Sequence, residues 1–229
     1  MHIPLSKRLQ ACCRYIQNGD RVADVGCDHG YLGIYLLANK IASSVYAADV
    51  NEMPLQSAKN NSERFGVSKH IQFILSDGVQ NVPHDFDTLV CAGMGADTII
   101  SILEAAPWLC DGTHRLVLQC QSKIPMLRKY LSEKGWHITA ESVLRDGRFL
   151  YTVMSVTWNP AISRLTIGES YFSPALLENP APVTSEYYQS ILFRLQRAIN
   201  GQKESADPDM LAAYQELKNL ESSYSWLKE

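Results

Sequence analysis

The chain has 229 residues, of which 46% are hydrophobic and 20% charged, and its formal net charge is −3. These values predict a globular protein with a substantial core. No apolar run approaches the roughly 18 residues that a membrane span needs, and no apolar stretch follows the first charges. We therefore expect a cytoplasmic protein without a secretory signal. The six cysteines form no C-x-x-C pair, so neither a zinc site nor a disulfide framework is expected.

Charge is unevenly distributed along the chain. Residues 115–148 hold seven basic residues against three acidic ones, and the first 21 residues hold four against one. Residues 161–229 hold six basic and nine acidic residues. Two basic stretches can bind phosphates even in a protein without net positive charge, because the local field matters more than the total. On charge alone, an ordinary solvated surface is the better interpretation.

Strand-like and helix-like segments alternate through the first 160 residues. Short apolar runs predict strands at 21–26, 44–49, 71–75, 87–92 and 115–120, and two more at 136–143 and 149–156. Helices are predicted at 31–39, 54–65, around 99–103, and at 125–134. This alternation indicates a parallel sheet covered by helices on both faces. The last two strands are joined by the Asp146–Gly147 turn, which makes them antiparallel.

The pattern changes after Trp158. Four prolines, at positions 160, 174, 180 and 182, predict a loop-rich stretch. Two helices are then predicted, at 185–199 and 208–227, with Asn200–Gly201 as a stop signal and Asp207–Pro208 as a start. We expect an antiparallel helical hairpin, and we divide the chain into domains at 1–160 and 161–229.

The first predicted strand runs directly into a glycine turn, residues 24–30 (DVGCDHG). Gly26 lets the backbone turn sharply, so that a ligand can approach the main chain at the carboxyl edge of the sheet. The dinucleotide fingerprint G-x-G-x-x-G is not matched. The run instead fits the D/E-x-G-x-x-x-G form of methyltransferases that bind S-adenosylmethionine.

An acidic residue lies at or just after the end of each of the first three predicted strands: Asp24, Asp49 and Asp77. Asp24 can accept hydrogen bonds from the ammonium group of S-adenosylmethionine, Asp49 from both ribose hydroxyls, and Asp77 from the adenine amino group. Asp49 lies 23 residues after Gly26, close to the roughly 20 expected. Each acid alone suits a helix cap or a solvated loop, but three in succession favour S-adenosylmethionine over NAD.

The fourth strand leads into residues 93–97 (GMGAD), where such methyltransferases place the methyl acceptor. Two glycines there would let a flat substrate lie against the backbone. The N/D-P-P-Y/F run typical of enzymes that methylate an exocyclic amine is missing. Asp97 suits a helix N-cap or first-turn acid equally well.

Four runs carry a family resemblance: residues 5–9 (LSKRL), 24–32 (DVGCDHGYL), 92–95 (AGMG) and 146–151 (DGRFLY). In this order they resemble the bacterial tRNA (adenine(22)-N1)-methyltransferases, over nearly the whole chain. The resemblance implies an α/β fold, with a Rossmann-like seven-stranded methyltransferase sheet, helices on both faces and a small α-helical C-terminal hairpin. It implies transfer of a methyl group from S-adenosylmethionine to N1 of adenine 22, in the D-arm region of tRNA. No metal and no membrane are implied; the oligomeric state is open, with a monomer favoured.

The resemblance also implies roles for individual residues. It assigns cofactor binding to Asp24, Gly26, Asp28, His29, Asp49, Asp77 and Gly93, to which we add the neighbours Cys27, Gly30, Val50 and Gly78. The candidate catalytic residues are Asp28, Tyr31, Gly93 and Met94. The candidate RNA-binding residues are Lys7, Arg8, Gln119, Gln121, Arg148, Arg194 and Arg197, with Lys203 between the last two helices.

The expected chemistry depends mainly on positioning. Adenine N1 has an in-plane lone pair that can attack the sulfonium methyl in line, so strong general-base activation is not required. The base must leave the tRNA stack, at a cost of a few kcal/mol. Tyr31 could stack on it or be a core aromatic residue. His29 could bond the cofactor or substrate, or be structural.

Two positions depart from the family pattern. Ala96 stands where family members typically have glycine, and Cys120-Gln121 stands where they typically have Pro-Asn. The second departure lies near the expected substrate pocket. A methyltransferase of another RNA base or of a small molecule, and a non-catalytic RNA-binding protein that retains the fold, therefore stay open as alternatives. An NAD-dependent oxidoreductase is disfavoured by the missing third glycine.

Overall fold

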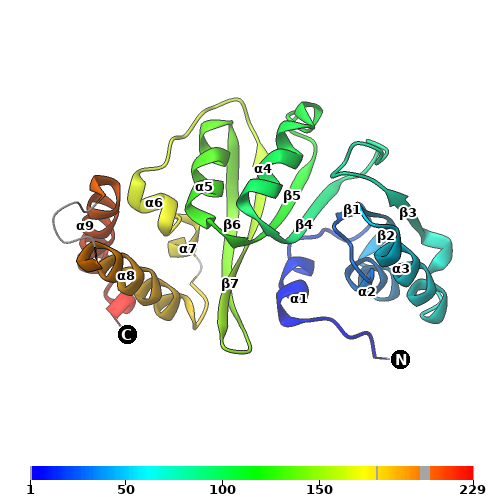
Figure 1. The fold of residues 1–229 in the computed structure, drawn as a ribbon, viewed down its shortest axis with the longest axis horizontal. Coiled ribbons are helices and arrows are strands. Elements are labelled where there is room, and N and C mark those ends of the chain that lie inside the picture. Colours follow the sequence, from blue (N-terminus) through cyan, green and yellow to red (C-terminus); the bar gives the residue numbers. More distant parts are fainter. Residues whose placement is uncertain (1, 179, 202–206, 229) are drawn as a thin grey trace.

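The computed structural model describes residues 2–178, 180–201 and 207–228. A seven-stranded mixed sheet runs through the centre of the molecule, with strand order β3-β2-β1-β4-β5-β7-β6 (Figure 1). The first five strands are parallel, and β7 is antiparallel to both of its neighbours. The strands are β1 Asp20–Val25, β2 Ala42–Asp49, β3 Ile71–Leu75, β4 Thr88–Gly95, β5 Arg115–Ser122, β6 Trp136–Asp146 and β7 Phe149–Trp158. The expected Rossmann-like sheet is confirmed.

Helices cover both faces of this sheet because successive strand residues point to opposite sides. Val90 and Val117 belong to one core cluster, with α1, α2 and α3, whereas Leu116 and Leu118 belong to the other, with α4 and α5. These helices are α1 Lys7–Cys13, α2 Tyr31–Ala38, α3 Glu52–Arg64, α4 Ala96–Glu104 and α5 Ile124–Glu133. Short 3-10 turns, η1 Ser68–His70 and η2 Pro107–Leu109, precede β3 and β5.

Three short helices were not predicted from the sequence. The first, α1, begins after Ser6, whose side chain accepts a hydrogen bond from the Leu9 backbone N–H. The other two, α6 Ile167–Tyr171 and α7 Ala175–Glu178, lie in the stretch expected to be loop. A capping box between Thr166 and Glu169 begins α6. Helices this short carry too little periodicity to stand out in a sequence.

The last two helices form the expected antiparallel hairpin, α8 Thr184–Gly201 and α9 Pro208–Ser223. Tyr188, early in α8, donates a hydrogen bond to the carbonyl of Leu217, late in α9 (2.6 Å). The expected end of the second helix at 227 is wrong. The helix ends at Ser223, and a 3-10 turn, η3 Ser225–Lys228, follows. Ser222 hydrogen-bonds back to the Asn219 carbonyl, and serines that bond to nearby backbone groups favour helix ends.

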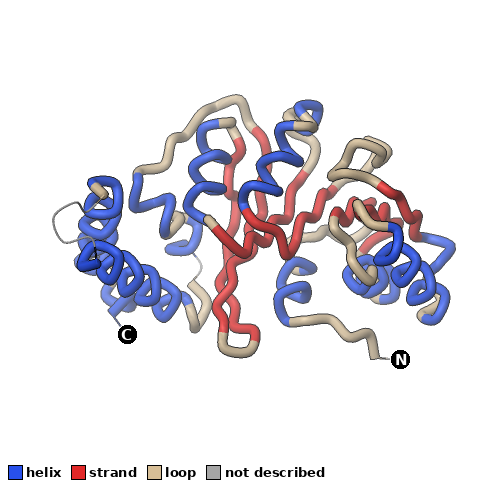
Figure 2. The backbone as a smooth tube through the Cα atoms, in the orientation of Figure 1, coloured by secondary structure: helices blue, strands red, loops and turns tan. Residues whose placement is uncertain are grey.

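The hairpin packs on the far edge of the sheet rather than standing free. Val143 of β6 shares a core cluster with Tyr187, Tyr188 and Ile191 of α8. Figure 2 shows β6 and β7 continuing as a two-stranded ribbon beyond the rest of the sheet, and β7 pairs with β5 only over residues 154–157. Most leucine and tyrosine side chains of α8 and α9 therefore pack within this chain, although Leu211 stays 45% exposed.

A buried ion pair connects the helical extension (residues 161–229) to the sheet. Arg128 of α5 donates to Glu141 of β6 at 2.6 Å, and both side chains are fully buried. The same guanidinium donates to the carbonyls of Ser170 and Tyr171 at the end of α6 (3.0 and 2.6 Å). These bonds satisfy the two terminal nitrogens of Arg128, whereas its Nε and the Glu141 Oε2 have no hydrogen-bond partner among the described residues. Arg128 thereby joins α5, β6 and α6 through one buried charge.

Candidate active site

A cavity of about 210 Å³ opens at the carboxyl edge of the sheet. The strands β1 and β4 are parallel neighbours, so the segments that follow them meet at this edge. The cavity is lined by residues of α1, of the two strand ends, of the turn after β1 and of the start of α2: Arg8, Leu9, Asp24, Gly26, Cys27, Asp28, His29, Tyr31, Leu32, Ala92 and Gly93.

The turn after β1 favours glycine at Gly26, because its backbone is left-handed and a larger residue would have to displace the end of the Met94 side chain. Its φ is +72°, and a Cβ there would lie 2.4 Å from the terminal carbon of Met94. The N–H groups of Gly26 and Cys27 both donate to the Ala48 carbonyl of β2 (2.8 and 3.0 Å). The backbone is thus bent away from the strand and anchored to its neighbour, which leaves an open cradle above the strand end.

Asp24 lies at the base of this cradle with only 3% of its surface exposed. Its Oδ2 atom has no hydrogen-bond partner among the described residues. Burial raises the pKa of this carboxyl to about 7; a backbone hydrogen bond from Gly33 acts in the opposite direction, and the charge of Asp49 raises it further. A buried carboxyl oxygen without a partner needs a donor or a cation, and the cavity beside it gives a ligand ammonium group access.

Asp49, at the end of β2, holds the same turn from the other side. Its Oδ2 accepts a hydrogen bond from the Asp28 N–H (3.2 Å) and its Oδ1 from the Asn51 N–H (3.0 Å). Asp28 itself has a φ of +51°, an uncommon conformation for a residue with a side chain. Each carboxylate oxygen can accept more than one hydrogen bond, so Asp49 can support the turn and still accept from a ligand hydroxyl.

The opposite wall of the cavity is built around Gly93, where β4 leaves its regular pairing with β5. Its φ is +85°, and its N–H donates to the side-chain oxygen of Gln119 (3.1 Å). Arg8 donates to the same oxygen at 2.7 Å, and a Cβ at Gly93 would lie 2.9 Å from that guanidinium. The backbone N–H of Arg8 also donates to Asp146, in the turn between β6 and β7 (3.3 Å).

Comparison with known proteins identifies the family that shares this architecture. A family model described as "methyltransferase domain" matches residues 5–154. The tRNA (adenine(22)-N(1))-methyltransferase of Bacillus subtilis is 35% identical over 153 residues, which are 66% of this chain and 64% of that protein. This chain belongs to the methyltransferase family.

Solved structures show which proteins of that family this chain resembles. The Bacillus subtilis m1A22 tRNA methyltransferase TrmK superposes with a TM-score of 0.79 at 27% identity, over 100% of both chains. A Streptococcus pneumoniae protein solved in complex with S-adenosyl-L-methionine gives 0.82 at 29% identity, over 94% of this chain and 99% of that one. The resemblance to the tRNA (adenine(22)-N1)-methyltransferases, expected from four sequence runs, is confirmed.

The methyltransferase cavity does not include every residue expected to bind the cofactor. Asp49 and Gly30 do not line it. Val50 lies beyond it after β2, and Asp77 and Gly78 lie beyond it after β3. This part of the edge carries three exposed apolar side chains: Val50 (63% exposed), Met53 (82%) and Leu75 (46%). An apolar shelf next to a carboxylate suits a flat heterocycle with an amino group. Met53 and Leu75 were not predicted, because an exposed apolar residue gives no signal in a sequence.

The expected catalytic residues are partly brought together. Asp28 and Tyr31 line the cavity, while Met94 lies over Gly26 without lining it. The His29 ring stands 3.6 Å from the Asp28 carboxylate and 6.2 Å, between ring centroids, from Tyr31. These groups form one polar rim at the mouth of the cavity.

The expected RNA-binding residues are spread over several surfaces. Arg8 and the fully buried Gln119 belong to the cavity wall, with Lys7 exposed beside them. Arg148 stacks over Phe149 at 4.9 Å in the turn between β6 and β7. Gln121 and Arg194 line a second cavity, Arg197 is exposed on α8, and Lys203 lies outside the described residues.

Neither a membrane helix nor a metal centre is found in the described part of the chain. No helix there is long and apolar enough to cross a membrane. No three His, Cys, Asp or Glu side chains among those residues are grouped so that they could hold a metal ion. The six cysteines are free thiols, and burial raises the pKa of each one inside the core, such as Cys12 and Cys91 to about 12.

Proposed function

We propose that this methyltransferase transfers the methyl group of S-adenosylmethionine to N1 of adenine 22 in the D-arm region of tRNA. The observation that carries the proposal is that Asp24 and Gly93 line one cavity, and that the buried Asp24 Oδ2 has no hydrogen-bond partner among the described residues. The named activity of the Bacillus subtilis relative supplies the acceptor base, and its whole-chain structural likeness supports the transfer of that activity.

The cofactor fits the residues at the carboxyl edge. When bound, S-adenosylmethionine supplies a methyl group activated by its sulfonium. Asp24 would accept hydrogen bonds from the ammonium group, Asp49 from the ribose hydroxyls, and Asp77 from the adenine amino group. The methionine part would lie along the Gly26 turn, which lines the cavity and carries no side chain there.

The acceptor adenine would enter between the polar rim and the Gly93 wall. Tyr31 would stack on the unstacked base, and Asp28 would accept a hydrogen bond from its exocyclic amine. Gln119 and Arg8 act on the wall itself, because both are hydrogen-bonded to each other beside Gly93. Attack by N1 needs correct placement more than proton removal, and placement is what a rigid wall and an aromatic platform provide.

We further propose that the enzyme acts in the cytoplasm as a monomer, without a metal. We divide it into a catalytic domain at 1–160 and a helical extension at 161–229. The extension has its own core cluster, which includes Val143 of β6, and this supports its treatment as an appended unit docked on the sheet edge.

The direct test is transfer of tritiated methyl from S-adenosylmethionine to unmodified tRNA, followed by nucleoside digestion. We expect label in 1-methyladenosine, its loss when adenine 22 is replaced by guanine, and none on free adenosine. Tyr31→Phe keeps the stacking ring and should retain activity, whereas Tyr31→Ala should lose it. Label in a different nucleoside, or in a small molecule only, would assign another substrate to the same fold.

A further inference from the structure

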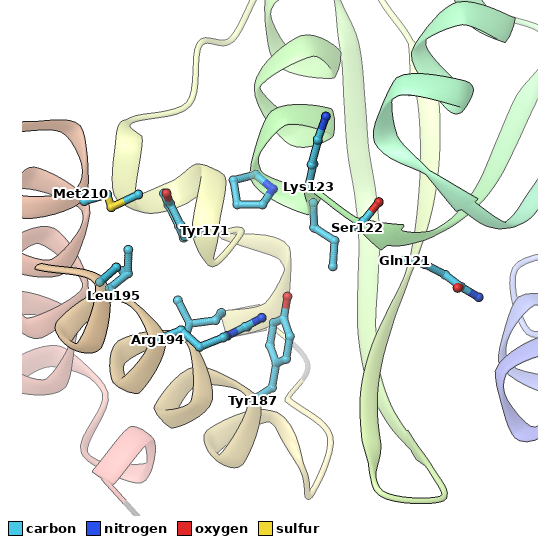
Figure 3. A pocket seen from close by; sticks show the side chains of 12 residues that line it. Gln121, Ser122, Lys123, Tyr171, Tyr187, Arg194, Leu195 and Met210 are labelled. Atoms are coloured by element: carbon cyan, nitrogen blue, oxygen red, sulfur yellow. The ribbon is translucent and has the colours of Figure 1, made fainter. Parts of the chain in front are cut away.

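A second cavity, of about 300 Å³, lies between the carboxyl end of β5 and the helical extension. Figure 3 shows its lining side chains, with Tyr187 and Arg194 reaching from α8 toward the segment that follows β5. Tyr171 of α6 borders it from above in that view. None of its lining residues is shared with the cavity around Asp24.

The lining combines aromatic rings with positive charge. Two phenol rings come from different helices: Tyr171 is half-buried, and Tyr187 is only 4% exposed. Apolar side chains from α5, α8 and α9 complete the surface. Arg194 donates from Nε to the Ser190 carbonyl (3.1 Å), and no hydrogen bond of its two terminal nitrogens is found within the described part of the chain. Lys123 is paired with Asp97 at 2.8 Å. Among the described residues no acidic side chain lines this cavity, although the pKa of Tyr171 is raised by burial and also by the charges of Asp207 and Asp209.

This chemistry suits an unstacked nucleotide. Aromatic side chains and guanidinium groups stack on bases, and a guanidinium with free nitrogens pairs with phosphate. A cavity of a few hundred cubic ångströms with few polar groups has the size of a small-ligand site. The guanidinium of Arg194 disfavours a cationic occupant, and the tyrosine side chains add a preference for a flat ring over an acidic peptide.

The position of the cavity points to the same RNA as the proposed substrate. Strand β5 contributes Gln119 to the wall of the first cavity and Gln121 to the second. Residues two apart on a strand point to the same face of the sheet, so both cavities adjoin the end of this one strand. A polymer that places one unit in the first cavity has further units within reach of the second.

We propose that the second cavity holds another nucleotide of the RNA substrate, unstacked while the acceptor adenine occupies the first cavity. The proposal rests on the proposed function, since it takes the substrate to be RNA. It gives the extension a role in choosing the substrate: the RNA must present two nucleotides that can leave the stack at the correct separation.

The test compares matched pairs of variants in binding to unmodified tRNA, measured by fluorescence anisotropy. Ala198→Trp fills the cavity, whereas Ala212→Trp places the same side chain on α9 at a partly buried alanine that does not line it. Arg194→Ala removes a lining charge, whereas Arg197→Ala removes an exposed charge three residues away on the same helix.

We expect Ala198→Trp to weaken tRNA binding by roughly 5- to 150-fold, the range for loss of one stacked base. Ala212→Trp should have little effect, and Arg194→Ala should weaken binding more than Arg197→Ala. In a scan with abasic nucleotides, one position other than the acceptor should weaken binding to the wild type by the same factor. That position should cost the Ala198→Trp variant nothing more, because the two changes remove one contact.

The outcomes separate the two proposals. If the wild type methylates tRNA, and Ala198→Trp and Arg194→Ala bind it no worse than their controls, the cavity does not hold RNA and the proposed function stands. If the wild type neither methylates nor binds tRNA, both proposals fail. Affinity for S-adenosylmethionine and the melting temperature are measured on every variant. If Ala198→Trp does not fold, the exposed Arg194 and Arg197 pair decides the question.

Discussion

The Asp24 carboxyl should make cofactor binding depend on pH near neutrality. It is buried, its Oδ2 has no partner among the described residues, and its pKa is raised to about 7 mainly by burial. The ammonium group of S-adenosylmethionine pairs with the ionised carboxylate. Binding should therefore tighten as pH rises through this range, because less free energy is then spent on ionising Asp24.

The size of the effect follows from the ionised fraction. With a pKa of about 7, roughly 9% of Asp24 is ionised at pH 6 and roughly 76% at pH 7.5, so the affinity should rise about eightfold. The ordinary α-amino pKa is about 7.7–8.0, so roughly 60–75% of the ligand ammonium is still charged at pH 7.5, and this lowers the expected rise to about five- to sixfold. Titration calorimetry at several pH values measures the affinity for S-adenosylmethionine.

Two variants make the measurement specific. Asp24→Asn should bind weakly and without this pH dependence, because its side chain carries no charge at any of these pH values. Asp77→Asn removes an exposed carboxylate at the same edge of the sheet and should keep the pH dependence. A flat profile for the wild type, or an unchanged profile for Asp24→Asn, would refute the reasoning.

The same raised pKa works against the folded protein. Because the folded pKa of about 7 lies above the ordinary 3.8, the stabilising contribution of neutral Asp24 is complete below about pH 3.8 and is lost as pH rises through 7. The loss above pH 7 is on the order of 4 kcal/mol, at about 1.4 kcal/mol per pKa unit. Without cofactor, Asp24→Asn should therefore melt at a higher temperature than the wild type at pH 8. A lower melting temperature there would contradict this account.

Three further sets of substitutions test the frame around the site. Arg128→Met should lower the free energy of unfolding in urea by about 3–5 kcal/mol, because it leaves Glu141 buried without its partner, and Glu141→Leu added to it should recover most of the loss. Gly26→Ala and Gly66→Ala share a φ of +72°, but only at Gly26 does the added Cβ meet another side chain at 2.4 Å. Both should lose roughly 1–2 kcal/mol of stability to strain, and only the first should lose cofactor affinity; equal affinities would argue against the cradle. Gln119→Leu leaves two donors without an acceptor, so methyl transfer should fall while S-adenosylmethionine still binds, and an unchanged rate would show that this wall is dispensable.

Much of the cofactor end of the site was predictable from the sequence. Asp24, Gly26 and Asp49 lie at strand ends, and the carboxyl ends of parallel strands meet at one edge of the sheet. Their proximity therefore follows once the strands are recognised by their apolar runs. The seven strands and the closing antiparallel pair follow from the same local patterns, because each strand is marked by its own residues.

The acceptor side was only partly predictable. Arg8 and Gln119 were both expected to contact RNA, yet the structure hydrogen-bonds them to each other beside Gly93. Their contact joins residues 111 positions apart through the docking of α1, a helix too short to show in the pattern. Which polar group reaches which depends on that docking and not on either local sequence.

The sequence by itself determined where the strands lie along the chain, the glycine turn and the series of acids. Each of these rests on local residue patterns and on the rule that the carboxyl ends of parallel strands converge. Tertiary structure alone decided what the helical extension covers. It brings Tyr171 and Tyr187 against the end of β5, and it sets Arg128 against Glu141 and the end of α6. An apolar stripe on a helix predicts that this face will be buried. Which segment covers it depends on packing between parts of the chain that are distant in sequence.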